Sequence, residues 1–169
     1  IAGGEAAFRA LRAGADAVWV GTRLVASIEA YANVGYKERL VLADGDATVT
    51  TSMFGPEAPN RAVRVLRNRV VNEFAGREGE IPSPPPPPDE IGTTLLFPLT
   101  FKQPYEMPKF SAIVPTPETV GDFEEMCLPA GGDSARKIDV IQPAADIIVE
   151  MMTDAQRLIA QGLVSSEAE

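Results

Sequence analysis

The sequence contains no histidine among its 169 residues and only one cysteine, Cys127. The absence of histidine excludes a Ser-His-Asp triad and a histidine-based zinc site, and it removes the usual side chain for proton transfer near neutral pH. A single cysteine excludes an intramolecular disulfide framework and is typical of a reducing, cytoplasmic environment. Without a histidine to activate it, Cys127 is predicted to be a buried structural thiol rather than a nucleophile.

Long apolar runs and positive charge are also scarce. No run approaches the roughly 20 apolar residues of a membrane-spanning helix, and the first residues do not resemble a signal peptide. The formal net charge of −9 argues against nucleic acid and against an anionic membrane as partners. We therefore expect a cytoplasmic protein with a small-molecule or protein partner and possible homo-oligomerisation. Because the chain begins at Ile1 rather than Met, we also expect it to be a piece of a longer protein.

The first residues predict a strand, a helix and a second strand. Four apolar residues follow one another at 17–20 without polar alternation, which is typical of a parallel strand covered on both faces. A first strand is predicted to end at Gly3, and the helix between the strands is predicted to end at Gly14, the position of a glycine cap. The apolar residues of this helix share one face: Phe8, Leu11 and Ala15.

Each predicted strand ends in a turn that contains glycine, the first at Gly3 and Gly4, the second at Gly21 and Thr22. Parallel strands place their carboxyl ends at one edge of a sheet, so the two turns are expected side by side. Glycine lets the backbone approach a ligand, and threonine offers a hydroxyl and an N–H. The pattern predicts a phosphate site, as in the loops after strands seven and eight of TIM barrels. The alternative is two tight turns that need glycine only for conformation.

The middle of the chain predicts two helices and a short extended segment. Residues 23–42 have helical spacing, with Ser27 as a possible N-cap. Residues 48–51 are β-branched and predict an extended segment. Residues 60–74 are predicted to be helical from their apolar spacing. The arginines of this predicted helix either contact an anion or face solvent: Arg61, Arg64, Arg67 and Arg69.

Prolines dominate the next part of the chain. The run at 84–88 lies in a composition break over 76–94 and predicts a domain-edge connector, or alternatively an SH3-type ligand. Residues 100–117 are predicted to be ordered coil without a backbone ladder, because prolines interrupt them. Pro143 is predicted to begin an amphipathic helix that docks on another element. Its apolar face contains Ile147, Ile148, Met151, Met152, Ala155, Leu158 and Ile159.

Residues 1–4 and 13–23 resemble the end of the barrel in the nitronate monooxygenase family, formerly called 2-nitropropane dioxygenases. The resemblance continues through residues 64–69 and 130–132 and covers nearly the whole chain. It implies an α/β fold, the carboxyl-terminal part of a (β/α)8 TIM barrel plus a helical substrate or lid domain with a long proline-rich coil. The implied divisions are 1–43 (last βαβα segment of the barrel), 44–75 (helical lid segment), 76–118 (proline-rich extended region) and 119–169 (lid completion and carboxyl-terminal amphipathic helix).

The resemblance also implies an FMN-dependent oxidation of alkyl nitronates by O₂. Gly3, Gly4, Gly21 and Thr22 match the two turns at the FMN phosphate in the family. The family's catalytic histidine lies upstream of Ile1, so no catalytic residue is assigned to this chain, which is expected to be inactive alone. In the family several residues separate the Gly-Gly turn from the helix, whereas here Glu5 follows directly. A carboxylate there opposes phosphate binding unless it points to solvent.

Two alternatives stay open. NADH:quinone reductases and flavin-dependent enoyl-ACP reductases carry close versions of the Gly14–Thr22 sequence. They differ from nitronate monooxygenases in the compound that reduces the flavin, which is NADH rather than a nitronate. The alternative from another class is a non-catalytic binding module, or a degenerate fragment that needs a partner chain.

Overall fold

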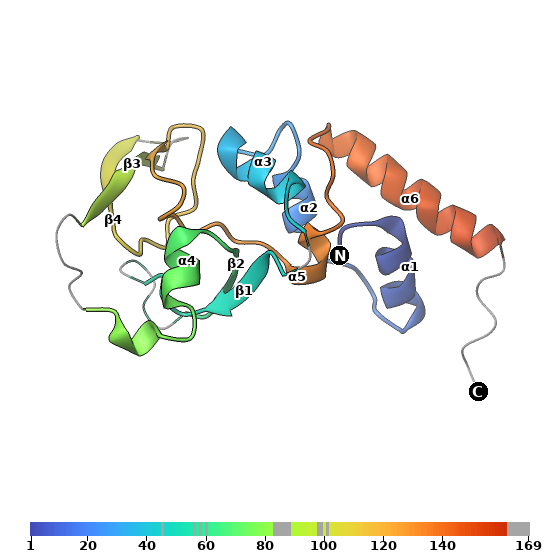
Figure 1. The fold of residues 1–169 in the computed structure, drawn as a ribbon. Helices are drawn as coiled ribbons and strands as arrows, with labels where there is room; N and C mark the ends of the chain where they lie inside the picture. Colours follow the sequence, from blue (N-terminus) through green and yellow to red (C-terminus); the bar gives the residue numbers. More distant parts are fainter. Residues whose placement is uncertain are drawn as a thin grey trace.

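The computed structural model describes residues 1–44, 46–55, 57, 59, 61–82, 89–97, 100 and 102–161. The molecule is elongated, with the first and last helices packed together at one end and a β-hairpin at the other (Figure 1). The helices are α1 (Gly4–Arg12), α2 (Thr22–Val25), α3 (Val34–Val41), α4 (Arg69–Phe74), α5 (Gly132–Ala135) and α6 (Ala144–Ala160), with a 3₁₀ turn η1 (Glu78–Glu80). The strands are β1 (Thr48–Thr51), β2 (Val63–Leu66), β3 (Glu90–Leu96), β4 (Gln103–Pro108) and β5 (Val120–Gly121).

The described strands form two small antiparallel sheets. In the first, β1 pairs with β2, and Thr48 lies opposite Leu66. In the second, β3 lies between β4 and β5. The fold is thus a mixture of helices and strands, as predicted, but the described part contains neither a parallel strand pair nor a barrel.

The two strands predicted near the amino terminus are absent from the described structure. Residues 1–2 and 17–20 have no strand partner, and Trp19, predicted to be buried, is 89% exposed. Val18 and Val20 still pack on the cluster that joins α1 to α6. The prediction of a βαβ unit is wrong for the described residues, because a strand exists only where a neighbouring strand accepts its backbone hydrogen bonds.

The helix between these segments is confirmed as α1. Gly14 has a φ of +99°, its N–H donates to Leu11 O, and the Ala15 N–H donates to Ala10 O. These bonds form a Schellman motif, the glycine termination that the sequence predicted. The buried face is different from the predicted one. It contains Gly4 and Ala7, while Leu11 is 46% exposed.

The single helix predicted over residues 23–42 is two helices, α2 and α3, separated by a turn. Asn33 is the N-cap of α3, and its side chain accepts a hydrogen bond from the Gly35 N–H at 2.9 Å. Ser27 instead accepts from the Ala30 N–H within the turn, so its prediction as a helix N-cap is wrong. Both residue types compete for local backbone donors, and the sequence alone does not tell which one begins a helix.

The prediction at residues 48–51 is confirmed as β1, whereas the helix predicted over 60–74 is only partly correct. Residues 63–66 form β2, and α4 begins after Asn68. Residues 63–66 contain three apolar residues and one arginine, and so short an apolar run suits a strand as well as a helix. Pairing with β1 decides the outcome, because it satisfies the β2 backbone.

The ordered coil predicted at residues 100–117 contains strand β4. Pro104 and Pro108 lie within it, opposite Leu95 and Glu90 of β3. A proline lacks an N–H donor but is accepted on an edge strand, and β4 is at the edge of its sheet. Residues 83–88 lie outside the described residues, so the prediction for the proline run is not addressed.

The predicted amphipathic helix is confirmed as α6, with Pro143 at its N-cap. It docks on α1 as expected, and Ile147 and Met151 are buried together with Ala7. The buried stripe is narrower than predicted, since Ile148, Met152 and Ile159 are each about half exposed. Among the described helices, none is long and apolar enough to span a membrane.

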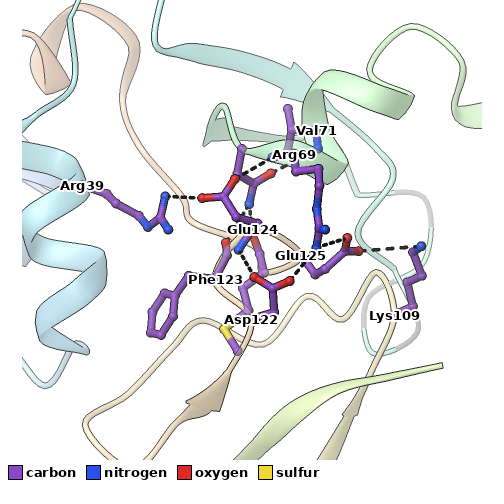
Figure 2. A network of polar contacts seen from close by, with 10 residues as sticks. Arg39, Arg69, Val71, Lys109, Asp122, Phe123, Glu124 and Glu125 are labelled. Carbon is purple, nitrogen blue, oxygen red and sulfur yellow. Dashed lines mark hydrogen bonds and ion pairs between the residues drawn. The ribbon is translucent and has the colours of Figure 1, made fainter. Parts of the chain in front are cut away.

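The turn at residues 122–126 caps helix α4 and links it to its neighbours (Figure 2). Glu124 accepts from the Arg69 N–H at 2.9 Å and pairs with Arg39 of α3 at 2.7 Å. Glu125 pairs with Arg69 at 2.9 Å and lies 3.8 Å from the Lys109 ammonium. Exposed ion pairs contribute little one by one, so we assign this network an orienting role.

The Glu57 carboxylate also holds the segment after β1 in place by hydrogen bonds. Glu57 accepts hydrogen bonds from the hydroxyls of Tyr105 and Ser111, at 2.7 and 2.6 Å, and from the Ala112 N–H at 2.7 Å. Partial burial disfavours the ionised form, but these hydrogen bonds outweigh it and hold the pKa of Glu57 below its ordinary value. The ionised carboxylate therefore stabilises the folded state.

We expect the Glu57→Gln substitution to lower stability at neutral pH and to matter less in acid. The pKa of Glu57 is depressed on folding, so its contribution is complete above the unfolded-state pKa near 4.5 and disappears as pH falls through the lower folded-state pKa. Urea unfolding between pH 7 and pH 3 measures the difference. Glu73→Gln, at an exposed position of α4, is the matched control. A difference that stays constant with pH contradicts the assignment.

Candidate phosphate-binding turns

The Gly21–Thr22 turn begins helix α2 and faces open space. Gly21 is the N-cap of α2 and has no side chain to cap it. A Cβ atom built on Gly21 would approach only the indole nitrogen of Trp19, at 3.9 Å. The backbone at this turn is therefore accessible to a ligand, as the sequence predicted.

Thr22 joins this turn to a second glycine pair that lies far along the sequence. Its hydroxyl oxygen accepts a hydrogen bond from the Gly131 N–H at 2.8 Å, immediately before α5. The contact is tight, because a Cβ on Gly131 would lie 3.1 Å from that oxygen. Since the hydroxyl accepts from Gly131, its own hydrogen remains available to donate to another acceptor.

Gly3 and Gly4 have different roles in the structure. Gly3 is the extended N-cap of α1, and a Cβ there would have nothing within 4 Å. Gly4 is the first residue of α1 and is buried, because a Cβ there would lie 2.2 Å from the Met151 carbonyl oxygen of α6. Glu5 is exposed and pairs with Arg9 at 2.8 Å, so its carboxylate is directed along the helix surface.

Both predicted turns border the segment that contains α5. The Ile1 amino group, two residues before Gly3, donates to the Ser134 hydroxyl at 2.9 Å, and Thr22 contacts Gly131. Figure 1 shows the amino terminus beside α5. Residues near each turn thus contact the α5 segment, while the closeness of the two turns to one another stays a prediction. Their role in phosphate binding stays a prediction.

Two buried cations fix the chain that follows the turn. Arg23 is 5% exposed and donates to the Val140 carbonyl at 3.1 Å. Its burial lowers the pKa of the guanidinium, and the nearby carboxylates of Glu150 and Asp139 act in the opposite direction. Lys37 donates to the Ser27 carbonyl at 2.7 Å. Both charges are used within the fold: Arg23 holds α2 against the segment before α6, and Lys37 holds the turn after α2 against α3.

Cys127 is buried, as predicted, and packs with Phe54 and Phe110. Burial, with a smaller effect of Glu57, raises the pKa of its thiol to about 12. The protonated thiol at neutral pH fits a structural role.

The Gly131–Gly132 pair was not predicted from the sequence to belong to the candidate site. It forms part of the family resemblance, but no local pattern connects it to Thr22 across a separation of 109 residues. A second glycine pair before a short helix was the available signal. In the structure this pair supplies the neighbour against which Thr22 is oriented.

The family described as nitronate monooxygenase matches residues 3–154. Two solved structures are similar to this chain: FabK from Thermotoga maritima, at 26% identity with a TM-score of 0.62, and a point mutant of that FabK, at 24% identity with a TM-score of 0.58.

Each structural match covers 95% of this chain but only 43% and 40% of the respective FabK chains. No curated protein matches this chain. By its sequence over most of its length, the chain belongs to the nitronate monooxygenase family.

Proposed function

We propose that this chain forms the phosphate-binding part of an FMN-dependent oxidoreductase that oxidises alkyl nitronates with O₂. The observation that carries the proposal is the open Gly21–Thr22 turn, whose hydroxyl is oriented by Gly131. Membership in the nitronate monooxygenase family supports the flavin. Because the chain spans less than half of the FabK chains it matches, the activity belongs to the proposal for the whole protein.

The described residues fit a phosphate group in three respects. The backbone at Gly21 is open, and the Thr22 hydroxyl has a hydrogen to donate. The first N–H groups of α1, after Gly3, have no acceptor within the helix and no capping side chain. The positive end of the α1 dipole also favours an anion. In the proposal, Gly3, Gly4, Gly21 and Thr22 hold the FMN phosphate.

When bound, the flavin supplies the redox chemistry, and the protein supplies position and electrostatics. Backbone donors at Gly21 and Thr22 bind phosphate oxygens without a charged side chain. Gly4 contributes in another way, since its contact with Met151 fixes the start of α1 against α6. The pair therefore divides its roles, with Gly3 facing the ligand and Gly4 holding the helix that presents the donors.

The second candidate is a reductase of the same family, acting on a quinone or an enoyl thioester with NADH as the reductant. The structural similarity to FabK supports this reductase candidate. Anaerobic mixing of the flavin-loaded full-length protein with NADH or with an alkyl nitronate separates the two, because only the true reductant bleaches the flavin. If the full-length protein binds no flavin, both oxidoreductase candidates fail and the alternative of a non-catalytic binding module remains.

We expect the Gly21→Asp substitution to weaken FMN binding by about a hundredfold, because it places a carboxylate beside the phosphate dianion. Gly21 has a φ of −103°, which other residues adopt, so the change alters charge rather than backbone conformation. Fluorescence titration of FMN with the full-length protein measures the loss.

The matched control is Gly79→Asp in η1, where the same charge is added at an exposed glycine with nothing within 4 Å of its Cβ position. Equal FMN affinity in the two variants contradicts the assignment of Gly21. Thermal melting of both variants checks that folding is intact.

A further inference from the structure

Arg64 on strand β2 is exposed and has no carboxylate partner among the described residues. Its guanidinium makes one hydrogen bond, to the Thr48 hydroxyl at 3.3 Å. By contrast, six other arginines are within 4.0 Å of a carboxylate: Arg9, Arg39, Arg69, Arg77, Arg136 and Arg157. Arg61 and Arg67 also lack a carboxylate partner among the described residues, so the position of Arg64, rather than its missing ion pair, distinguishes it.

The side chain of Arg64 lies over the glycine pair that contacts Thr22. A Cβ on Gly132 would lie 3.6 Å from Cδ, 3.7 Å from Nε and 3.9 Å from Cζ of Arg64. These are ordinary van der Waals distances, so the Arg64 side chain lies against Gly132, next to the residue whose N–H donates to the Thr22 hydroxyl.

The backbone of Arg64 is held in the same place. Its carbonyl accepts from the Ala130 N–H at 2.9 Å, and the next residue, Val65, forms a bridge with Pro129. These bonds tie β2 to the residues directly before Gly131. The position of Arg64 relative to the Gly21–Thr22 turn is thus set by backbone contacts, while its guanidinium stays exposed.

We propose that Arg64 binds the phosphate group of the ligand held at the Gly21–Thr22 turn. This inference rests on the proposed function and adds the cationic residue that the glycine turns lack. A phosphomonoester carries a charge of about −1.5 to −2 at pH 7, and backbone N–H groups alone do not neutralise it. The planar guanidinium of arginine donates to two phosphate oxygens at once. Arg64 therefore selects phosphorylated over unphosphorylated flavin.

The test compares FMN with riboflavin, which has the same ring system and no phosphate. We expect Arg64→Gln in the full-length protein to weaken FMN binding about tenfold, the loss of one charge-assisted interaction, and to leave riboflavin binding unchanged. Arg64→Lys keeps the charge and is expected to recover part of the FMN affinity. The matched control is Arg61→Gln, an exposed arginine just before β2.

The possible outcomes distinguish a failure of the role of Arg64 from a failure of the proposed function. Loss of FMN affinity with unchanged riboflavin affinity, seen in Arg64→Gln and not in Arg61→Gln, supports the role of Arg64. Equal losses for both flavins, or wild-type FMN affinity in Arg64→Gln, overturn it while the proposed function stands. If Arg64→Gln does not fold, Arg64→Lys decides: a reduced FMN affinity with unchanged riboflavin affinity supports the role, and wild-type FMN affinity overturns it. A wild-type protein that binds neither flavin overturns the proposed function, and the role of Arg64 with it.

Discussion

Replacing Gly4 by alanine is expected to lower the free energy of unfolding by about 2–3 kcal/mol, the upper part of the range for overpacked positions. The added Cβ would lie 2.2 Å from the Met151 carbonyl oxygen and 2.6 Å from the Asp154 Cβ, both on α6. A backbone carbonyl cannot rotate away as a flexible side chain does, so α1 and α6 must separate. Alanine is a better helix former than glycine, but that gain of at most about 1 kcal/mol is smaller. Urea unfolding measures the change.

Gly3→Ala is the control, because its Cβ position has nothing within 4 Å and its φ of −151° suits any residue. The two variants differ by one position and add the same methyl group. If both unfold at the wild-type urea concentration, the close packing of α1 on α6 is contradicted. A loss restricted to Gly4→Ala assigns this glycine to helix packing.

The elements that depend on local chemistry were predictable from the sequence, and those that depend on a distant partner were not. Gly14 ends α1 because its φ of +99° is natural only for glycine, and this requirement is visible in the sequence. Residues 17–20 have the composition of a strand but no described neighbour to pair with. Residues 63–66 were assigned to a helix, and their pairing with β1 makes them a strand.

The same distinction applies to the candidate site. The openness of the backbone at Gly21 follows from the residue type and was expected. The neighbours that give this turn its chemistry come from far along the chain: Gly131 by a hydrogen bond to Thr22, and Arg64 by its contact with Gly132. From the sequence, Arg64 either contacts an anion or faces solvent, and only its spatial position beside Gly132 favours the first.

The largest loss of stability from a polar substitution is expected at Asn68, the N-cap of α4. Its side chain is 4% exposed; it donates to the carbonyls of Phe123 and Met126, at 3.0 and 2.9 Å, and accepts from the Val71 N–H at 3.1 Å. Asn68→Ala removes the cap and leaves two buried carbonyls without their donor. We expect a loss of about 3 kcal/mol, about 1 from the cap and the rest from the unsatisfied carbonyls, measured by urea unfolding.

Asn72→Ala is the control, since this exposed asparagine lies four residues further along α4 and its side chain accepts one hydrogen bond among the described residues, from Arg67 at 3.3 Å. Asn68→Asp separates the two functions of the amide. The carboxylate still caps α4, but it cannot donate to the Phe123 and Met126 carbonyls and repels their oxygens. If the capping bond dominates, Asn68→Asp retains most of the stability. If Asn68 chiefly anchors the 122–126 turn, as its two donated hydrogen bonds indicate, Asn68→Asp is at least as unstable as Asn68→Ala.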